Sequence, residues 1–149
     1  MILLLNAFFV IVFDQLSKTY IRNTFSEGQS IPIIEGIFHI TYIRNLGGAF
    51  GLFPDRQLMF LVLSMVVIFL IIVYWWQLGT EGRLMQIALG LELGGVIGNL
   101  VDRILTGHVT DFLDFRFWPV FNVADIAIVS GLFFVLFALL RTFRRETRI

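Results

Sequence analysis

One long uncharged stretch constrains the fold of this chain more than any other feature. Leu58 to Trp76 is nineteen residues long, with no charged residue and one serine. A helix of about 20 apolar residues crosses the hydrocarbon core of a bilayer, where exposed backbone outside a helix or closed barrel is very costly. The sequence therefore predicts a transmembrane helix over residues 58–76.

Three further stretches have similar length and character, at about 2–21, 84–101 and 123–140. The whole chain is 58% apolar with a mean hydropathy of +0.87, which is too apolar for an ordinary soluble domain. The first stretch lacks a basic leader and a clear cleavage site, so we expect a retained anchor. A single membrane domain over residues 1–149 is predicted.

Charge and cysteine content exclude several classes of function. Eleven basic and eleven acidic residues cancel, so a nucleic-acid partner is not expected. The absence of cysteine excludes disulfides, thiol catalysis and cysteine metal sites. His39 and His108 are isolated from acidic residues at ligand spacing, so neither a metal site nor a cofactor is expected.

The two longer connections, at about 22–57 and 102–122, are predicted to lie on one side of the membrane. Residues 37–43 and 109–117 are rich in β-branched and aromatic residues and are bounded by glycine or proline, as strands are. The expected fold class is an α-helical membrane protein, with four transmembrane helices and a small extracytoplasmic β-sheet on the outer membrane surface.

Orientation rests on the tail after Leu140, which carries four arginines. Basic residues favour the cytoplasmic side, and four spans then place both termini there. Counting all basic residues gives five inside against six outside, so the prediction depends on their density in the tail.

Two carboxylates stand beside the apolar stretches, Asp111 and Asp125. A carboxylate at the edge of hydrocarbon costs several kcal/mol unless it is compensated, so both are functional candidates. A second interpretation of Asp125 is structural, because Asn122-Val123-Ala124-Asp125 resembles a capping box at a helix start. Capping and catalysis can both hold.

The third span carries glycines at intervals of four, Gly90, Gly94 and Gly98, which predict a groove for a neighbouring helix. Asn99, Asp102 and Arg103 follow at its outer end. In a purely structural interpretation, Arg103 extends to the membrane surface and pairs with Asp102. Glu92, deeper in this span, is expected to be a protonated, hydrogen-bonded packing residue.

The first span contains Asp14 and Lys18, four residues apart and able to form an ion pair on one helix face. Such a pair either makes the helix end tolerable in lipid or acts directly in the site. Ser17 beside Lys18 raises the possibility of a serine–lysine protease. Adjacent helical residues point about 100° apart, which disfavours it.

Five motifs are spread over nearly the whole chain. They are Asp14-Gln15-Leu16-Ser17-Lys18, Asn45-Leu46-Gly47-Gly48-Ala49-Phe50, Gly94-Gly95-Val96-Ile97-Gly98-Asn99-Leu100-Val101-Asp102-Arg103, Val109-Thr110-Asp111-Phe112 and Phe121-Asn122-Val123-Ala124-Asp125. In this order they resemble the motifs of the lipoprotein signal peptidase (signal peptidase II) family. Two departures are visible: Gly48 replaces a frequent alanine, and the loop between Asp111 and Asp125 is short.

The resemblance implies an aspartic endopeptidase of the bacterial cytoplasmic (inner) membrane. Such an enzyme removes the signal peptide of a prolipoprotein by cutting before a diacylglyceryl-modified cysteine, near the outer face. It implies Asp111 and Asp125 as the catalytic pair, no cofactor, contact with membrane lipid and a monomer. Nine residues are implied to bind substrate or support the pair: Asp14, Lys18, Asn45, Gly47, Asn99, Asp102, Arg103, Asn122 and Ala124. The segment 47–53 is implied to close over substrate.

The chemistry agrees with this assignment, because two close carboxylates sharing one proton supply both a base and an acid. A separation of fourteen residues requires a turn through Trp118-Pro119 to bring Asp111 back to the start of the fourth span. Two other functions stay open. One is a four-span transporter that uses Glu92, and the other is a non-enzymatic assembly factor whose acids only cap and pair helices.

Overall fold

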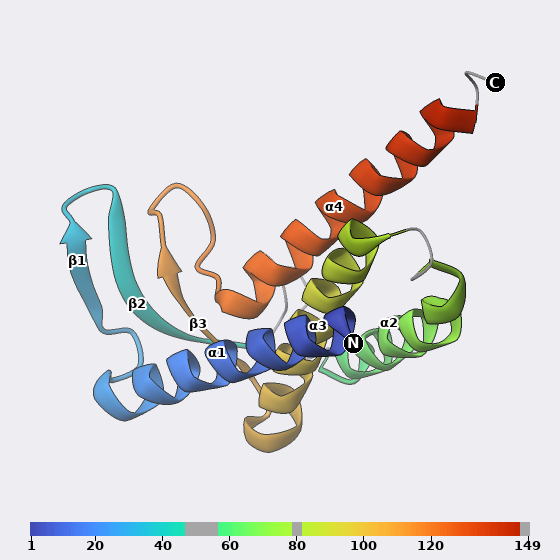
Figure 1. The fold of residues 1–149 in the computed structure, drawn as a ribbon. Coiled ribbons are helices and arrows are strands. Elements are labelled where there is room, and N and C mark those ends of the chain that lie inside the picture. Colours follow the sequence, from blue (N-terminus) through green and yellow to red (C-terminus); the bar gives the residue numbers. More distant parts are fainter. Residues whose placement is uncertain (47–56, 79–81, 147–149) are drawn as a thin grey trace.

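The computed structural model describes residues 1–46, 57–78 and 82–146, and Figure 1 shows their arrangement. Four helices in the described residues are long and apolar enough to cross a membrane. They are α1 (Ile2–Thr24), α2 (Gln57–Leu78), α3 (Arg83–Thr106) and α4 (Val123–Glu146). The predicted fold class, four membrane helices with a small sheet, is confirmed.

All four helices extend further than the predicted spans, α2 by one residue at its start and by two at its end. The helix α1 reaches Thr24 instead of Ile21, α3 reaches Thr106 instead of Val101, and α4 continues past Leu140. The polar residues at the end of α3 remain helical because the chain finds its stop signal only at Gly107. That residue has φ 78° and donates its N–H to the carbonyl of Arg103.

The helix α3 is the centre of the bundle and contacts the other three helices. Its glycines allow the backbone of α1 to approach, as predicted. A Cβ atom on Gly90 would lie 2.6 Å from the carbonyl oxygen of Leu3, and one on Gly94 would lie 2.8 Å from that of Ala7. Small residues replace the hydrophobic effect as the basis of close helix packing in lipid.

Glu92 belongs to the contact between α3 and α4. A Cβ atom on Gly131 of α4 would lie 2.6 Å from Cγ of Glu92, so the glutamate packs directly on that glycine. Glu92 was expected from the sequence to be a packing residue, and this agrees with the contact. The hydrogen bond that was also expected of the Glu92 carboxyl group is not found among the described residues.

Three antiparallel strands form a sheet in the order β1-β2-β3 (Figure 1). Their bounds are Ser30–Ile34, Phe38–Asn45 and Val109–Asp114. The strand expected over 37–43 is β2, whereas β1 was not predicted because Pro32 interrupts its β-branched run. The strand expected over 109–117 ends early, because the backbone N–H and the guanidinium of Arg116 both donate to Asp114 and Arg116 turns with φ 65°.

A small apolar cluster fixes the sheet to the helices. Ile21 of α1, Tyr42 of β2 and Phe112 of β3 are buried against one another, with Val123 at the start of α4 packed beside them. The sheet therefore holds β3 against the ends of α1 and α4, and this places Asp111 beside the first turn of α4.

Candidate active site

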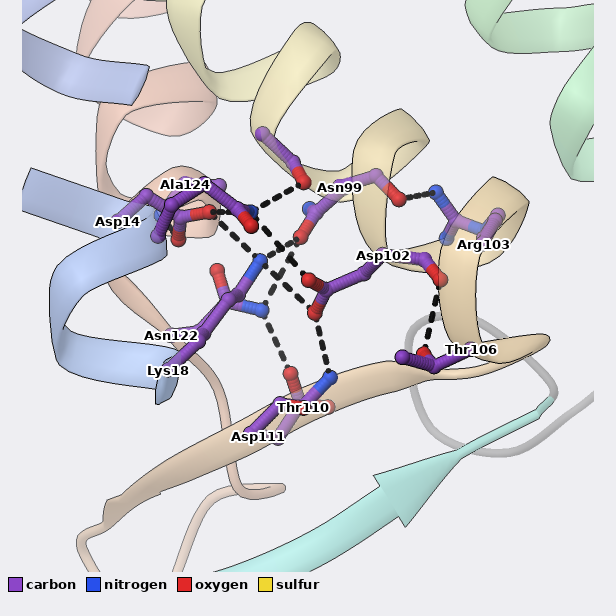
Figure 2. A network of polar contacts seen from close by, with 12 residues as sticks. Asp14, Lys18, Asn99, Asp102, Arg103, Thr106, Thr110, Asp111, Asn122 and Ala124 are labelled. Atoms are coloured by element: carbon purple, nitrogen blue, oxygen red, sulfur yellow. Dashed lines mark hydrogen bonds and ion pairs between the residues drawn. The ribbon is translucent and has the colours of Figure 1, made fainter. Parts of the chain in front are cut away.

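The two aspartates singled out in the sequence belong to one network of polar side chains. This network lies where the C-terminal ends of α1 and α3 meet the strand β3 and the first turn of α4 (Figure 2). Most of its members are almost completely buried.

Asp111 is a buried member of β3, with 2% of its surface exposed. Its carboxylate accepts two hydrogen bonds from side-chain amides. Nδ2 of Asn45 lies 2.8 Å from Oδ2, and Nδ2 of Asn122 lies 2.6 Å from Oδ1. These neutral donors orient the carboxylate without cancelling its charge.

Asp125 lies in the first turn of α4 and forms the predicted capping box with Asn122. The N–H of Asp125 donates to Oδ1 of Asn122 at 3.0 Å, and the N–H of Asn122 donates to Oδ2 of Asp125 at 3.1 Å. Its other oxygen, Oδ1, accepts a 2.8 Å hydrogen bond from Nδ2 of Asn99. Capping therefore uses one carboxylate oxygen, while the second faces α3.

Two asparagines join the two carboxylates. Asn122 donates to Asp111 and Asn99 donates to Asp125, and Nδ2 of Asn122 lies 3.2 Å from Oδ1 of Asn99. The chain returns from Asp111 to α4 through a loop that Leu113 and Phe121 close, with N–H···O distances of 2.8 and 3.1 Å. The predicted turn through residues 118–119 is confirmed.

Burial, together with the negative charge of Asp125, raises the pKa of Asp111 to about 7. Hydrogen bonds from Asn45 and Asn122, and the charge of Lys18, act in the opposite direction. Asp111 therefore keeps a proton near neutral pH while it remains in the electrostatic field of Asp125.

Lys18 is the buried cation of the network, with no exposed surface. Its Nζ lies 2.8 Å from Asp14, 3.4 Å from Asp102 and 2.9 Å from Oδ1 of Asn99. The predicted ion pair of Asp14 and Lys18 is confirmed. The serine–lysine interpretation is wrong, because the Ser17 hydroxyl donates to the carbonyl of Asp14 and Lys18 is bound elsewhere.

The structural interpretation of Arg103 is also wrong in one respect. Asp102 pairs with Lys18 and Arg22 instead of Arg103. The guanidinium of Arg103 lies over the ring of Phe60, 5.2 Å from its centroid, and donates to the carbonyl of Asn99 at 3.4 Å. Arg103 thus lies beside the site and contacts α2.

Ala124 and Gly47 are the remaining residues that the resemblance implied for the site. Ala124 is completely buried, and its N–H donates to Oδ1 of Asp14 at 2.9 Å. Gly47 and the segment 47–53 that was expected to close over substrate lie outside the described residues. The described residues contain no group of three or more His, Cys, Asp or Glu side chains suited to a metal ion.

Sequence reasoning missed three residues of the network. Gln15 contacts Asp14, Asp102 and the carbonyl of Gly98 through one amide nitrogen. Arg22 donates to Asp102 and to the hydroxyl of Thr110, and the N–H of Thr110 donates to Asp102. Gln15 and Arg22 were visible as polar residues three and four positions from Lys18, on neighbouring faces of one helix.

Comparison with known proteins gives a consistent result. Residues 6–141 match the family described as signal peptidase (SPase) II. The chain is 44% identical to the lipoprotein signal peptidase of Moorella thermoacetica, over 92% of this chain and 91% of that protein. It is also 44% identical to that of Halothermothrix orenii, over 82% and 83%.

Solved structures agree with the sequence comparison. A bacterial membrane enzyme determined by the in meso method at 2.3 Å resolution superposes with a TM-score of 0.91 and 31% identity, over 97% of this chain and 90% of that one. A second, at 1.9 Å resolution, gives a TM-score of 0.84 and 33% identity, with 93% and 92% covered. With a family match over most of its length and relatives above 40% identity, the chain belongs to the signal peptidase II family.

Proposed function

We propose that this protein is an aspartic-type endopeptidase that removes the signal peptide from prolipoproteins, cutting before a diacylglyceryl-modified cysteine. Family membership and the names of the relatives support the substrate class. One observation carries the catalytic assignment: two buried carboxylates from different elements are held by two asparagines that also contact each other.

In the proposed reaction, Asp111 and Asp125 share one proton. The ionised carboxylate removes a proton from a water molecule as that water attacks the scissile carbonyl carbon. The protonated carboxyl group then donates its proton to the leaving amide nitrogen, and the carbon–nitrogen bond breaks. One water is consumed, the signal peptide leaves with a new carboxylate, and the cysteine acquires a free amino group. No cofactor enters this scheme.

The raised pKa of Asp111 supports this division of labour. With its raised pKa, Asp111 can hold the shared proton at neutral pH, which leaves Asp125 to act as the base. Asn45, Asn99 and Asn122 fix the orientation of both carboxylates before substrate binds. Such preorganisation lowers the barrier because the groups need not reorganise during the reaction.

The location of the site supports an active centre at the outer face of the cytoplasmic membrane. It lies at one end of the bundle, beside the sheet and at the opposite end from the basic tail of α4. We infer that both termini are cytoplasmic, that the acyl chains of the substrate remain in lipid, and that one chain suffices for catalysis.

The test compares purified variants in detergent with a diacylglyceryl-modified prolipoprotein. We expect Asp111→Asn and Asp125→Asn each to lower the cleavage rate by about 10²-fold to 10⁴-fold or more, because each removes an acid–base group. Glu92→Gln, a matched acid-to-amide change within the same bundle, should keep most activity. Near-parental cleavage by both aspartate variants would falsify the mechanism. Inactivity of Glu92→Gln alone would favour the transporter.

A further inference from the structure

Two backbone amides, one just before each proposed catalytic aspartate, donate to buried carboxylates. The N–H of Thr110 donates to Oδ2 of Asp102 at 2.9 Å, and the N–H of Ala124 donates to Oδ1 of Asp14 at 2.9 Å (Figure 2). Consecutive Cα atoms lie about 3.8 Å apart, so fixing one amide restricts the position of the next residue. Asp102 and Asp14 therefore restrain the backbone at Asp111 and Asp125.

The two restraining carboxylates are joined through α1. Lys18 pairs with both, at 2.8 Å from Asp14 and 3.4 Å from Asp102. The amide nitrogen of Gln15 also contacts both, at 3.1 and 3.3 Å, and the carbonyl of Gly98 at 3.0 Å. One helix thus connects the two halves of the site by a cation and by a neutral amide.

The connection is balanced in charge and shielded from solvent. Asp14, Asp102 and Lys18 have at most 1% of their surface exposed, and Arg22 supplies the second positive charge at 3.1 Å from Asp102. Loss of one partner from such a cluster leaves an uncompensated buried charge. Each side chain is consequently held in one arrangement, as a positioning device requires.

We propose that Asp14, Gln15, Lys18 and Asp102 form one positioning unit, here called the α1 clamp, that sets the separation of the two catalytic carboxylates. It does so by holding the backbone amides of Thr110 and Ala124 at a fixed distance. This inference rests on the function proposed above. The clamp residues act through Asp111 and Asp125. Gln15 is the one clamp residue that the family resemblance does not already imply for the site.

Gln15→Met gives the cleanest test, because it removes the neutral bridge and keeps every ion pair. Misplacement of reacting groups by about 1 Å can cost 10²-fold in rate, so we expect kcat for the lipidated prolipoprotein to fall between 10-fold and 10²-fold. KM should stay within about twofold, because a positioning loss acts on the chemical step. A residue with only a structural role would lower thermal stability without this selective loss of kcat.

Gln86→Met is the matched control. Gln86 lies on α3, thirteen residues before Asn99 and about 20 Å along the helix from it. The same substitution there should leave kcat and KM unchanged.

A double-mutant cycle tests whether the clamp is one unit. Asp14→Asn and Asp102→Asn each replace one ion pair of Lys18 by a neutral contact, and the double variant replaces both. If the residues act together, the double variant loses about as much kcat as the worse single variant. Losses that multiply would mean two independent supports and would overturn the clamp.

Failure of the clamp and failure of the proposed function are distinguishable. No cleavage by the parental protein would refute the function and the clamp with it. An active parent, an inactive Asp111→Asn and a parental kcat for Gln15→Met would overturn the clamp alone. If Asp14→Asn or Asp102→Asn does not fold, the kcat of Gln15→Met tests the clamp alone, because this variant keeps every charged residue of the parental protein.

Discussion

At the scale of single residues, the site depends on neutral amides placed between charges. Asn45, Asn99 and Asn122 donate to the two proposed catalytic carboxylates. Lys18 and Arg22 instead pair with Asp14 and Asp102, and the guanidinium of Arg103 lies over the ring of Phe60. An ion pair with Asp111 or Asp125 would hold that carboxylate ionised and remove the shared proton. The arrangement therefore separates the charges that stabilise the fold from those proposed to catalyse.

Activity should fall as pH rises through about 7. Burial, with the charge of Asp125, raises the pKa of Asp111 to about 7, so deprotonation above this pH removes the acid that protonates the leaving nitrogen. A pH profile of kcat/KM should show this alkaline limb, with a second limb at low pH where the base becomes protonated. Constant kcat/KM from pH 6 to pH 9 would contradict the assignment.

The same pKa has a consequence for stability. The folded protein binds the Asp111 proton between the ordinary value of 3.8 and about 7, whereas the unfolded chain does not. The contribution of this group to the free energy of unfolding therefore decreases as pH rises across that window.

Asn45→Ala should move the alkaline limb to higher pH. The hydrogen bond from Asn45 stabilises the ionised form of Asp111, so its removal raises the pKa of that carboxyl group. The measurement is kcat/KM against pH, with Asn6→Ala at the other end of α1 as the control for an asparagine truncation. A limb that stays in place or moves to lower pH would be inconsistent with this hydrogen bond.

At the scale of elements, the spacing of glycines correctly predicted how a helix packs on α3, whereas the polar residues did not predict where α3 ends. Gly90 and Gly94 repeat every four positions and lie under α1, as their spacing indicates. The end of α3 was misjudged by five residues, because Asp102 and Arg103 suggested a loop while the stop signal is the left-handed Gly107. Strand β1 was missed because its proline and its edge position leave only a weak pattern.

Gly94→Ala should destabilise the bundle. Its Cβ would lie 2.7 Å from Cβ of Val10 and 2.8 Å from the carbonyl oxygen of Ala7, so α1 would have to move. Overpacking of this kind costs about 1–3 kcal/mol. The apparent Tm in detergent, at a fixed scan rate, should fall.

Val62→Ile is the control for this substitution. Val62 is 55% exposed on α2, so an added carbon there meets few neighbours and should leave Tm nearly unchanged. An unchanged Tm for Gly94→Ala would show that α1 does not pack on α3 as described.

At the scale of the whole molecule, the sequence predicted the four helices and most participants in the site but not how they are connected. Local hydropathy was sufficient for the helices. The pairing of Asp102 with Lys18 and Arg22, and the donation of backbone amides to Asp14 and Asp102, depend on contacts between distant segments. No local pattern encodes such contacts, and Gln15 and Arg22 were overlooked for this reason.

The proposed orientation can be tested by labelling, since the chain has no cysteine of its own. A cysteine in place of Glu35, between β1 and β2, should react with a membrane-impermeant maleimide added to intact cells stripped of their outer layers. A cysteine in place of Arg83, at the start of α3, should react only after permeabilisation. The reverse pattern would place the site on the cytoplasmic side.

Difference infrared spectroscopy can detect the proton that Asp111 and Asp125 are proposed to share. Spectra of the purified protein taken below and above pH 7 should differ by one protonated-carboxyl band that disappears as pH rises. We expect this band to be absent in Asp111→Asn. In Asp125→Asn it should disappear at a lower pH than in the parent, because burial still raises the pKa of Asp111 but the negative charge of Asp125 no longer does. Retention of the band in Asp125→Asn with an unchanged pH dependence would contradict the shared proton.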